Sequence, residues 1–311
     1  MKGSVYFGRC IFLSWYCDLG TCKFCFRSTI KHKIKHSSSA KRSVESILTD
    51  AIIGKNMGWG IEFLTGGYGI FSFDEIVDIA ENVSKIYEKK IWVNLGVLNE
   101  GELRKLKPFV EGVCASIETI EKTRHDELCP DKPIEPYEEM LKVARALGLK
   151  RSITIVVGLE KSISDIELLL DFIKKHELER ITFYALKPVK GSPFEKSPDA
   201  KYYAKWIRRV RECFPDIEIV AGLTPKNPEY TKYVVEAGAD AITKFPVLKK
   251  FNSEETKLIE KQIEEAGKEF MGYLNTFPGI SVDDEIQKLS LSNEQKERIR
   301  EKVEQYARKM R

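Results

Sequence analysis

Short apolar segments alternate with segments of helical periodicity along most of the chain. The apolar segments predict eight strands, at residues 5–15, 61–65, 91–95, 112–117, 151–157, 180–186, 217–221 and 239–243. The amphipathic segments predict helices at residues 43–57, 72–87, 100–106, 136–147, 162–175, 198–213, 228–236, 253–267 and 292–309. Ser72 is expected to cap its helix, with Glu75 completing a capping box.

This order predicts the α/β class and a parallel (βα)8 TIM-type barrel, because parallel neighbouring strands need crossover helices. No linker divides the alternating region, so we expect one barrel over residues 1–251. Residues 252–311 are expected to form a C-terminal helical extension packed on it. Active sites of such barrels lie at the C-terminal ends of the strands. The expected strand ends carry three clustered cysteines, Gly66-Gly67, Glu118, Gly158 and Lys187.

Composition excludes several classes of protein. The 311 residues carry a net charge of only +4 although 32% are charged, which argues against a dedicated nucleic-acid binder. The sequence contains no run of about 18 apolar residues, so it predicts no membrane span. The first residues lack the apolar core of a signal peptide, so we expect a cytoplasmic protein. The seven cysteines are then expected to be metal ligands or free thiols rather than disulfides.

The cysteines Cys17, Cys22 and Cys25 lie within nine residues, directly after the first expected strand. Thiolates this close can converge on one metal centre, and iron–sulfur clusters are held by such short runs. A structural zinc site takes four protein ligands, and the nearby His32 and His36 fall in a polar basic run. A zinc knuckle or three unrelated thiols are the alternatives to an iron–sulfur cluster.

This stretch resembles the cluster loop of the radical S-adenosylmethionine (SAM) enzymes. The two-residue second gap and the aromatic Phe24 before the last cysteine match the family pattern. The first gap departs from it, because four residues replace the usual three. Gly20 lies in this gap and is expected to absorb the extra residue in a tight turn.

Further strand ends resemble those of biotin synthase and its relatives within this family, over roughly residues 5–251. The segments that carry this resemblance are Leu64-Thr65-Gly66-Gly67, Asn94-Leu95-Gly96, Ser116-Ile117-Glu118-Thr119, Val157-Gly158-Leu159, Val189-Lys190-Gly191-Ser192-Pro193, Ala221-Gly222 and Glu236-Ala237-Gly238-Ala239-Asp240. Each segment alone is weak evidence for this resemblance, but all of them together in the expected order are strong evidence for it.

The resemblance implies a role for each matching residue. Cys17, Cys22 and Cys25 would hold a 4Fe-4S cluster whose open iron binds SAM. Gly66 and Gly67 would bring backbone close to the SAM amino group, and Ser116 and Glu118 would contact its ribose and methionine parts. Phe24 would stack near the adenine, and Val157 and Gly158 would line the adenosine. A core aromatic, a strand residue and a turn glycine are the simpler interpretations of the last three.

The resemblance stops at the second cluster of biotin synthase. Its ligand positions correspond here to Leu64, Trp92, Ser152 and Glu218, so this chain is not expected to be a biotin synthase. Cys114 is expected to point into the barrel and Cys129 to lie near its active face, where both could ligate an auxiliary cluster. Cys10, expected at the far end of its strand, and Cys213 are expected to be ordinary free thiols.

Tyr184 and Lys187 lie on and after the sixth strand, where relatives contact substrate, and Lys187 could bind a carboxylate or phosphate. A surface lysine is the simpler interpretation of Lys187. The basic run at residues 31–42 is either a solvated loop or a dock for an acidic carrier domain. The resemblance also implies a reductant such as ferredoxin or flavodoxin, and leaves room for a partner radical SAM subunit.

Three functions remain open from the sequence. The first is sulfur insertion, similar to archaeal-type lipoyl synthases of the biotin synthase group. The second is a single-cluster radical SAM enzyme, either a mutase like methylornithine synthase or an enzyme that builds the iron–guanylylpyridinol or iron hydrogenase cofactors. The third is a non-enzymatic iron–sulfur or zinc protein, which leaves Gly66-Gly67, Ser116 and Glu118 unexplained.

Overall fold

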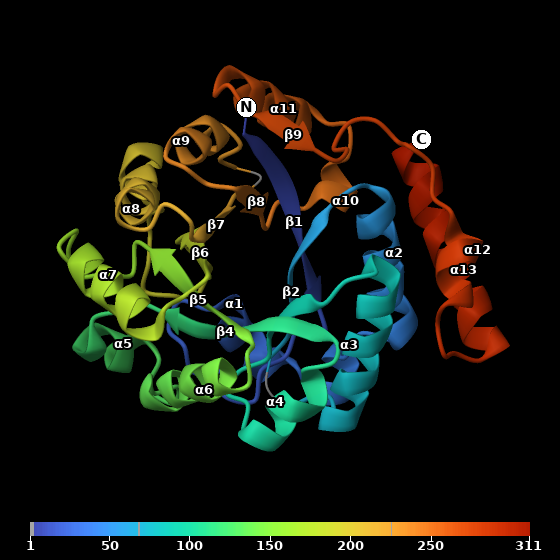
Figure 1. Cartoon of the computed structure of the whole chain (residues 1–311), viewed down its shortest axis with the longest axis horizontal. Coiled ribbons are helices and arrows are strands. Elements are labelled where there is room, and N and C mark those ends of the chain that lie inside the picture. The colour runs from blue at the N-terminus through green and yellow to red at the C-terminus, as the bar shows by residue number, and fades with distance from the viewer. Residues whose placement is uncertain (1–2, 68, 225) are drawn as a thin grey trace.

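Eight parallel strands close into a barrel in the computed structural model, which describes residues 3–67, 69–224 and 226–311 (Figure 1). The strands are β1 Ser4–Phe12, β2 Gly60–Thr65, β3 Ile91–Asn94, β4 Val110–Glu118, β5 Lys150–Val157, β6 Arg180–Ala185, β7 Glu218–Gly222 and β8 Ala241–Thr243. They pair in chain order, and β1 closes the barrel against both β2 and β8. The predicted (βα)8 barrel is confirmed.

Helices surround the barrel (Figure 1). They are α1 Phe26–Ile30, α2 Val44–Asn56, α3 Phe73–Tyr87, α4 Glu100–Leu106, α5 Lys122–Leu128, α6 Glu135–Ala146, α7 Asp165–His176, α8 Ala200–Cys213, α9 Tyr230–Glu236, α10 Val247–Lys250, α11 Glu254–Glu265, α12 Val282–Gln287 and α13 Asn293–Met310. The capping box of Ser72 and Glu75 is present at the start of α3. The short helices α1, α5, α10 and α12 escaped prediction, since so few turns show little periodicity.

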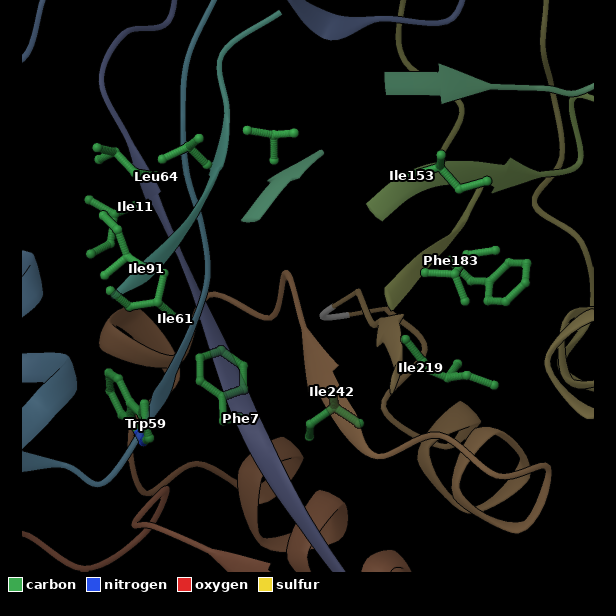
Figure 2. Packing of buried hydrophobic residues seen from close by; sticks show 14 of the residues in the cluster. Phe7, Ile11, Trp59, Ile61, Leu64, Ile91, Ile153, Phe183, Ile219 and Ile242 are labelled. Atoms are coloured by element: carbon green, nitrogen blue, oxygen red, sulfur yellow. The ribbon is translucent and has the colours of Figure 1, made fainter. Parts of the chain in front are cut away.

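The main apolar core lies between the strands and these helices. Alternate strand residues such as Leu64, Ile153 and Phe183 point outward and are fully buried (Figure 2). Because side chains alternate across a strand, the residues between them point into the barrel. No helix in the described residues is long and apolar enough to cross a membrane.

The C-terminal segment contains a strand that the sequence pattern did not predict. Strand β9, Glu269–Met271, pairs in parallel with the start of β1, so that Ser4 lies opposite Glu269. Helix α13 packs along α2 on the outside of the barrel (Figure 1). The C-terminal segment therefore adds a ninth strand to the sheet as well as helices.

The wall of the barrel is short between β1 and β8. Strand β8 has three residues, and its pairing with β1 ends where Gly8 lies opposite Thr243. The next residue, Lys244, has a left-handed backbone with φ of 63°, which turns the chain out of the sheet direction. Strand β1 continues to Phe12, so its last residues have no β8 partner.

Candidate active site

The three-cysteine loop leaves the end of β1 and folds across the barrel mouth. The backbone amide of Lys23 donates to the carbonyl of Leu128 at 2.9 Å, which ties the loop to the end of α5. Gly20 has a φ of 54°, the left-handed turn that the extra residue in the first gap was predicted to need. The ammonium of Lys31 donates to the carbonyl oxygens of Asp18 and Leu19 and closes this turn.

Gly67 fixes the distance between this loop and β2. A Cβ atom on Gly67 would lie 1.6 Å from the carbonyl oxygen of Tyr16 and 2.7 Å from Cα of Cys17. On Gly66 it would lie 3.1 Å from the Cβ of Leu13. The glycine pair is therefore required here so that the cysteine loop can pack directly on the end of β2.

A cavity of about 160 Å³, the central cavity, lies inside the barrel under the cysteine loop. Nine of the residues predicted for the site line it: Cys17, Cys22, Phe24, Cys25, Gly66, Gly67, Ser116, Glu118 and Tyr184. They come from the loop and from three strands or strand ends, those of β2, β4 and β6. The structure thus brings together most of the residues chosen from the sequence.

Polar side chains in the central cavity are held by neighbouring strands. The hydroxyl of Ser116 donates to Asn94 Oδ1 at 2.9 Å, and Thr65 donates to the Asn94 carbonyl at 2.7 Å. These contacts link the ends of β2, β3 and β4. Ser116 therefore points into the cavity with a fixed orientation.

Glu118 forms an ion pair with Lys132, whose Nζ lies 2.9 Å from Oε1. The strand is irregular between Ser116 and Glu118, and Glu118 has a φ of 66°. Both residues still line the cavity despite this break in alternation. Burial opposes the charge of Lys132, but Glu118, together with Tyr137, Cys129 and Cys22, outweighs it and raises the pKa of Lys132. Lys132 therefore keeps its proton beside Glu118.

Below this layer a fully buried carboxyl, Glu62, accepts hydrogen bonds from the hydroxyls of Tyr184 and Thr243. Burial, together with Glu62, raises the pKa of Tyr184 well above its usual value. Lys244 Nζ lies 4.9 Å from the centroid of the Tyr184 ring and 4.7 Å from that of Phe12. A protonated tyrosine and a lysine thus face the same space.

The thiols of the loop have different surroundings. Cys22 shares a hydrogen bond with Cys129, which lowers the pKa of Cys22 and raises that of Cys129. Burial raises the pKa of Cys25. Cys22 and Cys129 therefore lie within hydrogen-bonding reach of each other at the barrel mouth.

Residues 13–173 match the sequence profile of the Radical SAM superfamily. This chain belongs to the radical SAM superfamily. An uncharacterized protein of Methanocaldococcus jannaschii is 37% identical over 99% of this chain and 90% of its own. The match to the biotin synthase of Clostridium tetani is 25% identical and covers 71% of this chain and 69% of that enzyme. The match to the biotin synthase of Methanococcus vannielii is also 25% identical, and it covers 58% of this chain and 55% of that enzyme.

Among solved structures, the crystal structure of methylornithine synthase superposes with a TM-score of 0.70 over 86% of this chain and 83% of its own. At 16% identity this likeness shows the barrel fold alone. It agrees with the barrel predicted from the sequence. The biotin synthases among the relatives, with the profile match, agree with the predicted resemblance to the biotin synthase group.

The radical SAM family implies a 4Fe-4S cluster and SAM, and the donor set at the barrel mouth fits them. Three thiols line one cavity, and the absence of a Cβ atom on Gly67 lets the cysteine loop pack directly on the end of β2 beside them. Among residues 3–67, 69–224 and 226–311, no three His, Cys, Asp or Glu side chains come close enough to hold a single metal ion. A cubane cluster binds each thiolate through a different iron, so its ligands lie further apart than those of one ion.

Other predicted residues lie outside the lining of the central cavity. Val157 is fully buried in the main core, and a Cβ atom on Gly158 would lie 2.9 Å from Leu186. Their contacts with adenosine stay predictions. Lys187 is exposed and lines a neighbouring cavity of about 380 Å³, the rim cavity, together with Cys25 and Tyr184.

The spare cysteines lie in separate places. Cys114 points inward as predicted and packs with Phe63 and Trp92, whereas Cys129 packs beside Cys22 at the mouth. Cys10 was expected at the far end of its strand, but it lies near the C-terminal end of β1, 3.4 Å from Lys244 Nζ. Cys213 is exposed at the end of α8.

The sequence pattern did not indicate four polar residues of the site, which are Glu62, Asn94, Lys132 and Lys244. The side chain of Asn94 accepts the hydrogen bond of Ser116. Lys132 lies in a loop, and Lys244 follows a strand that is only three residues long. In a chain rich in lysine, neither position stands out. The one usable signal was the place of Lys244 directly after the eighth strand, the same criterion that selected Lys187.

Proposed function

We propose that this chain binds SAM at a 4Fe-4S cluster held by Cys17, Cys22 and Cys25 and cleaves it reductively to activate a substrate C–H bond. The observation that carries the proposal is the convergence of these cysteines with Gly67, Ser116 and Glu118 on one cavity at the barrel mouth. Held by these cysteines, the cluster would supply the one electron for reductive cleavage of SAM, and so the radical chemistry that abstracts a hydrogen atom from the substrate.

The residues of the chain position the reactants. Ser116, held by Asn94, offers its hydroxyl to a ribose, and Glu118, paired with Lys132, offers a carboxylate to the SAM amino group. Phe24 and Tyr137 give the cavity apolar walls that exclude water. Tyr184 lines the same cavity and keeps its proton, which it donates to Glu62.

Sulfur insertion is the first candidate for the reaction on the substrate. The curated biotin synthases among the relatives support it, as does the position of Cys129 beside Cys22 at the mouth. A second, auxiliary iron–sulfur cluster would serve as sulfur donor, with Cys114 and Cys129 as its proposed cysteine ligands.

A single-cluster mutase or cofactor-building enzyme is the second candidate. The separation of Cys114 from Cys129 favours it, since Cys114 is only 1% exposed and packs between Phe63 and Trp92. The two cysteines would need ligands from elsewhere in the chain, or a rearrangement, to share one cluster.

The proposed reaction also needs an electron donor, and the basic run at residues 31–42 is the proposed dock for a partner protein. We expect a cytoplasmic reductant such as ferredoxin or flavodoxin. Three cations of the basic run already have partners. Lys31 binds the cysteine loop, Lys41 pairs with Glu75, and Arg42 pairs with Asp50. Lys33 and Lys35 are exposed and would form the dock for an acidic carrier protein or a partner radical SAM subunit.

The test is the content of iron and acid-labile sulfide in anaerobically reconstituted protein. We expect about four irons per cluster, which are lost when Cys17, Cys22 and Cys25 are all changed to Ala and retained in the control Cys213→Ala. About eight irons, with about four surviving in the triple variant, would support sulfur insertion over the single-cluster candidate. Wild-type protein that binds no iron and does not cleave SAM under reduction would overturn the proposal.

A further inference from the structure

We propose that the gap in the barrel wall between β1 and β8 is a lateral substrate port for an amphipathic carboxylate. The inference rests on the proposed radical SAM function and names the class of substrate that the site would take. Its starting observation is a cavity of about 700 Å³, the side cavity, which is several times larger than the central cavity of about 160 Å³. The side cavity lies where the last residues of β1 lack a β8 partner, and its walls also come from α2, α10 and α13.

The side cavity adjoins the active site through two residues. Phe12 and Lys244 line the side cavity, the central cavity and the rim cavity. Lys244 Nζ lies 4.7 Å from the Phe12 ring centroid and 4.9 Å from that of Tyr184, so its side chain fills the junction between the cavities. A ligand that enters by the side cavity therefore reaches the cysteine loop past Lys244.

Lys244 can move aside. In the described part of the chain it forms no ion pair, and its hydrogen-bond partner is Cys10 Sγ at 3.4 Å. Burial raises the pKa of Cys10 to about 12, so this partner is a neutral thiol. Such a contact is weak compared with a charge-assisted bond to a carboxylate. Because Lys244 is exposed, its displacement into solvent gives up this contact and the two ring contacts but no ion pair with a described residue.

The lining of the side cavity indicates the chemistry of the ligand. Its inner walls are aromatic, with Phe12, Phe245 and Phe251. Its one carboxylate, Asp50, is neutralised by Arg9 at 2.7 Å and Arg42 at 3.2 Å. These walls suit an apolar chain.

The outer mouth of the side cavity is cationic. Lys249 on α10 and Lys309 on α13 are exposed there, and neither forms an ion pair with any residue that the structure describes. An anionic group is attracted to such uncompensated charges. We therefore place the carboxylate against Lys249 and Lys309, with the apolar body along the phenylalanines and its far end at Lys244.

Photoaffinity labelling of the reconstituted holoprotein tests this placement. The probe is a medium-chain fatty carboxylate with a diazirine at the far end, compared with the primary alcohol of the same length. We expect the carboxylate to label residues at the junction, such as Phe12 and Phe245, and to label them about tenfold more efficiently at limiting concentration than the alcohol. Loss of one charge-assisted contact has an effect of this size.

The double variant Lys249→Gln/Lys309→Gln should lower the apparent affinity for the carboxylate about tenfold. The control Lys257→Gln/Lys302→Gln removes the same charge from α11 and α13 outside the side cavity and should bind like wild type. Equal labelling by the alcohol, labelling outside the side cavity, or equal affinity in both double variants would each overturn the inference.

Iron content is measured on the same samples, which separates this inference from the proposed function. Protein with a full cluster that does not take up the probe refutes the port alone. Protein without iron that still takes up the probe refutes the radical SAM proposal, and leaves the side cavity as a carboxylate site.

Discussion

The two ends of the barrel differ in how their charged side chains are paired. At the N-terminal end, Arg180 lies 2.7 Å from Glu218, donates to the hydroxyl of Tyr6, and stacks 4.6 Å from the centroid of the Trp92 ring. At the C-terminal mouth, Lys244 faces three cavities with a neutral thiol as its hydrogen-bond partner. The arginine of the floor is fully paired, whereas at the mouth Lys244 has no ion pair in the described residues, although Lys132 nearby is paired with Glu118. Stability and chemistry are thus separated along the barrel axis.

The largest effect on stability is expected from Arg180→Met. The change leaves the Glu218 carboxylate without its partner and should lower the free energy of unfolding by about 3 kcal/mol. This is the lower end of the range for a broken buried pair, because the Glu218 side chain is 33% exposed. Denaturant unfolding of the apoprotein measures the loss.

The matched control is Arg209→Met, which removes an exposed pair between α8 and Glu167 and should change stability by less than about 0.5 kcal/mol. Iron binding should survive in both variants. If Arg180→Met lost the cluster while keeping its stability, the division between floor and mouth would be wrong.

An intermediate effect is expected from Gly67→Ala at the mouth. The new Cβ atom collides with the backbone of Tyr16 and Cys17, so the cysteine loop must move. We expect reconstituted iron to fall well below that of wild type, while the free energy of unfolding drops by only about 1–3 kcal/mol.

Gly66→Ala is the control for this prediction, because its Cβ atom meets a side chain at 3.1 Å and needs only a small adjustment. Equal iron content in the two variants would show that the glycine pair does not set the position of the loop. Iron per chain and denaturant unfolding are the two measurements.

The smallest effect concerns thiols away from the cluster. Cys10 is buried with a pKa of about 12, whereas Cys213 is exposed on α8. At about pH 8 an alkylating reagent should therefore modify Cys213 readily and leave Cys10 unmodified, because only the thiolate reacts. Mass spectrometry of the folded apoprotein checks this, and denatured protein serves as the control in which both react. Rapid labelling of Cys10 in the folded protein would show that the junction beside Lys244 is open to solvent.

The sequence predicted the parts of the site that depend on local pattern. Strand ends, the cysteine spacing, the turn at Gly20 and the pair Gly66-Gly67 all follow from a few neighbouring residues. Because the barrel rule brings strand ends together, these local features predicted most of the lining of the central cavity.

The rest depends on contacts between distant parts of the chain. Lys132 gains its role from an ion pair with Glu118 across a loop, and Glu62 from hydroxyls on β6 and on the last residue of β8. Cys10 was misplaced because strand β1 ends earlier than the apolar pattern suggests, at Phe12 rather than residue 15. The side cavity forms where β8 stops after three residues, and hydrophobic periodicity does not show the end of so short a strand reliably.

The pairing of β1 with β8 and β9 also has a consequence for how the protein is made. Strand β1 leaves the ribosome before the other strands of the barrel, yet its contact with Thr243 joins residues 235 positions apart, and β9 follows later still. Through most of translation one edge of β1 lacks its final partners, and an open strand edge pairs readily with other chains. The polar Ser4, Tyr6 and Arg9 interrupt the apolar run of β1, and they limit such mispairing until the last strands arrive.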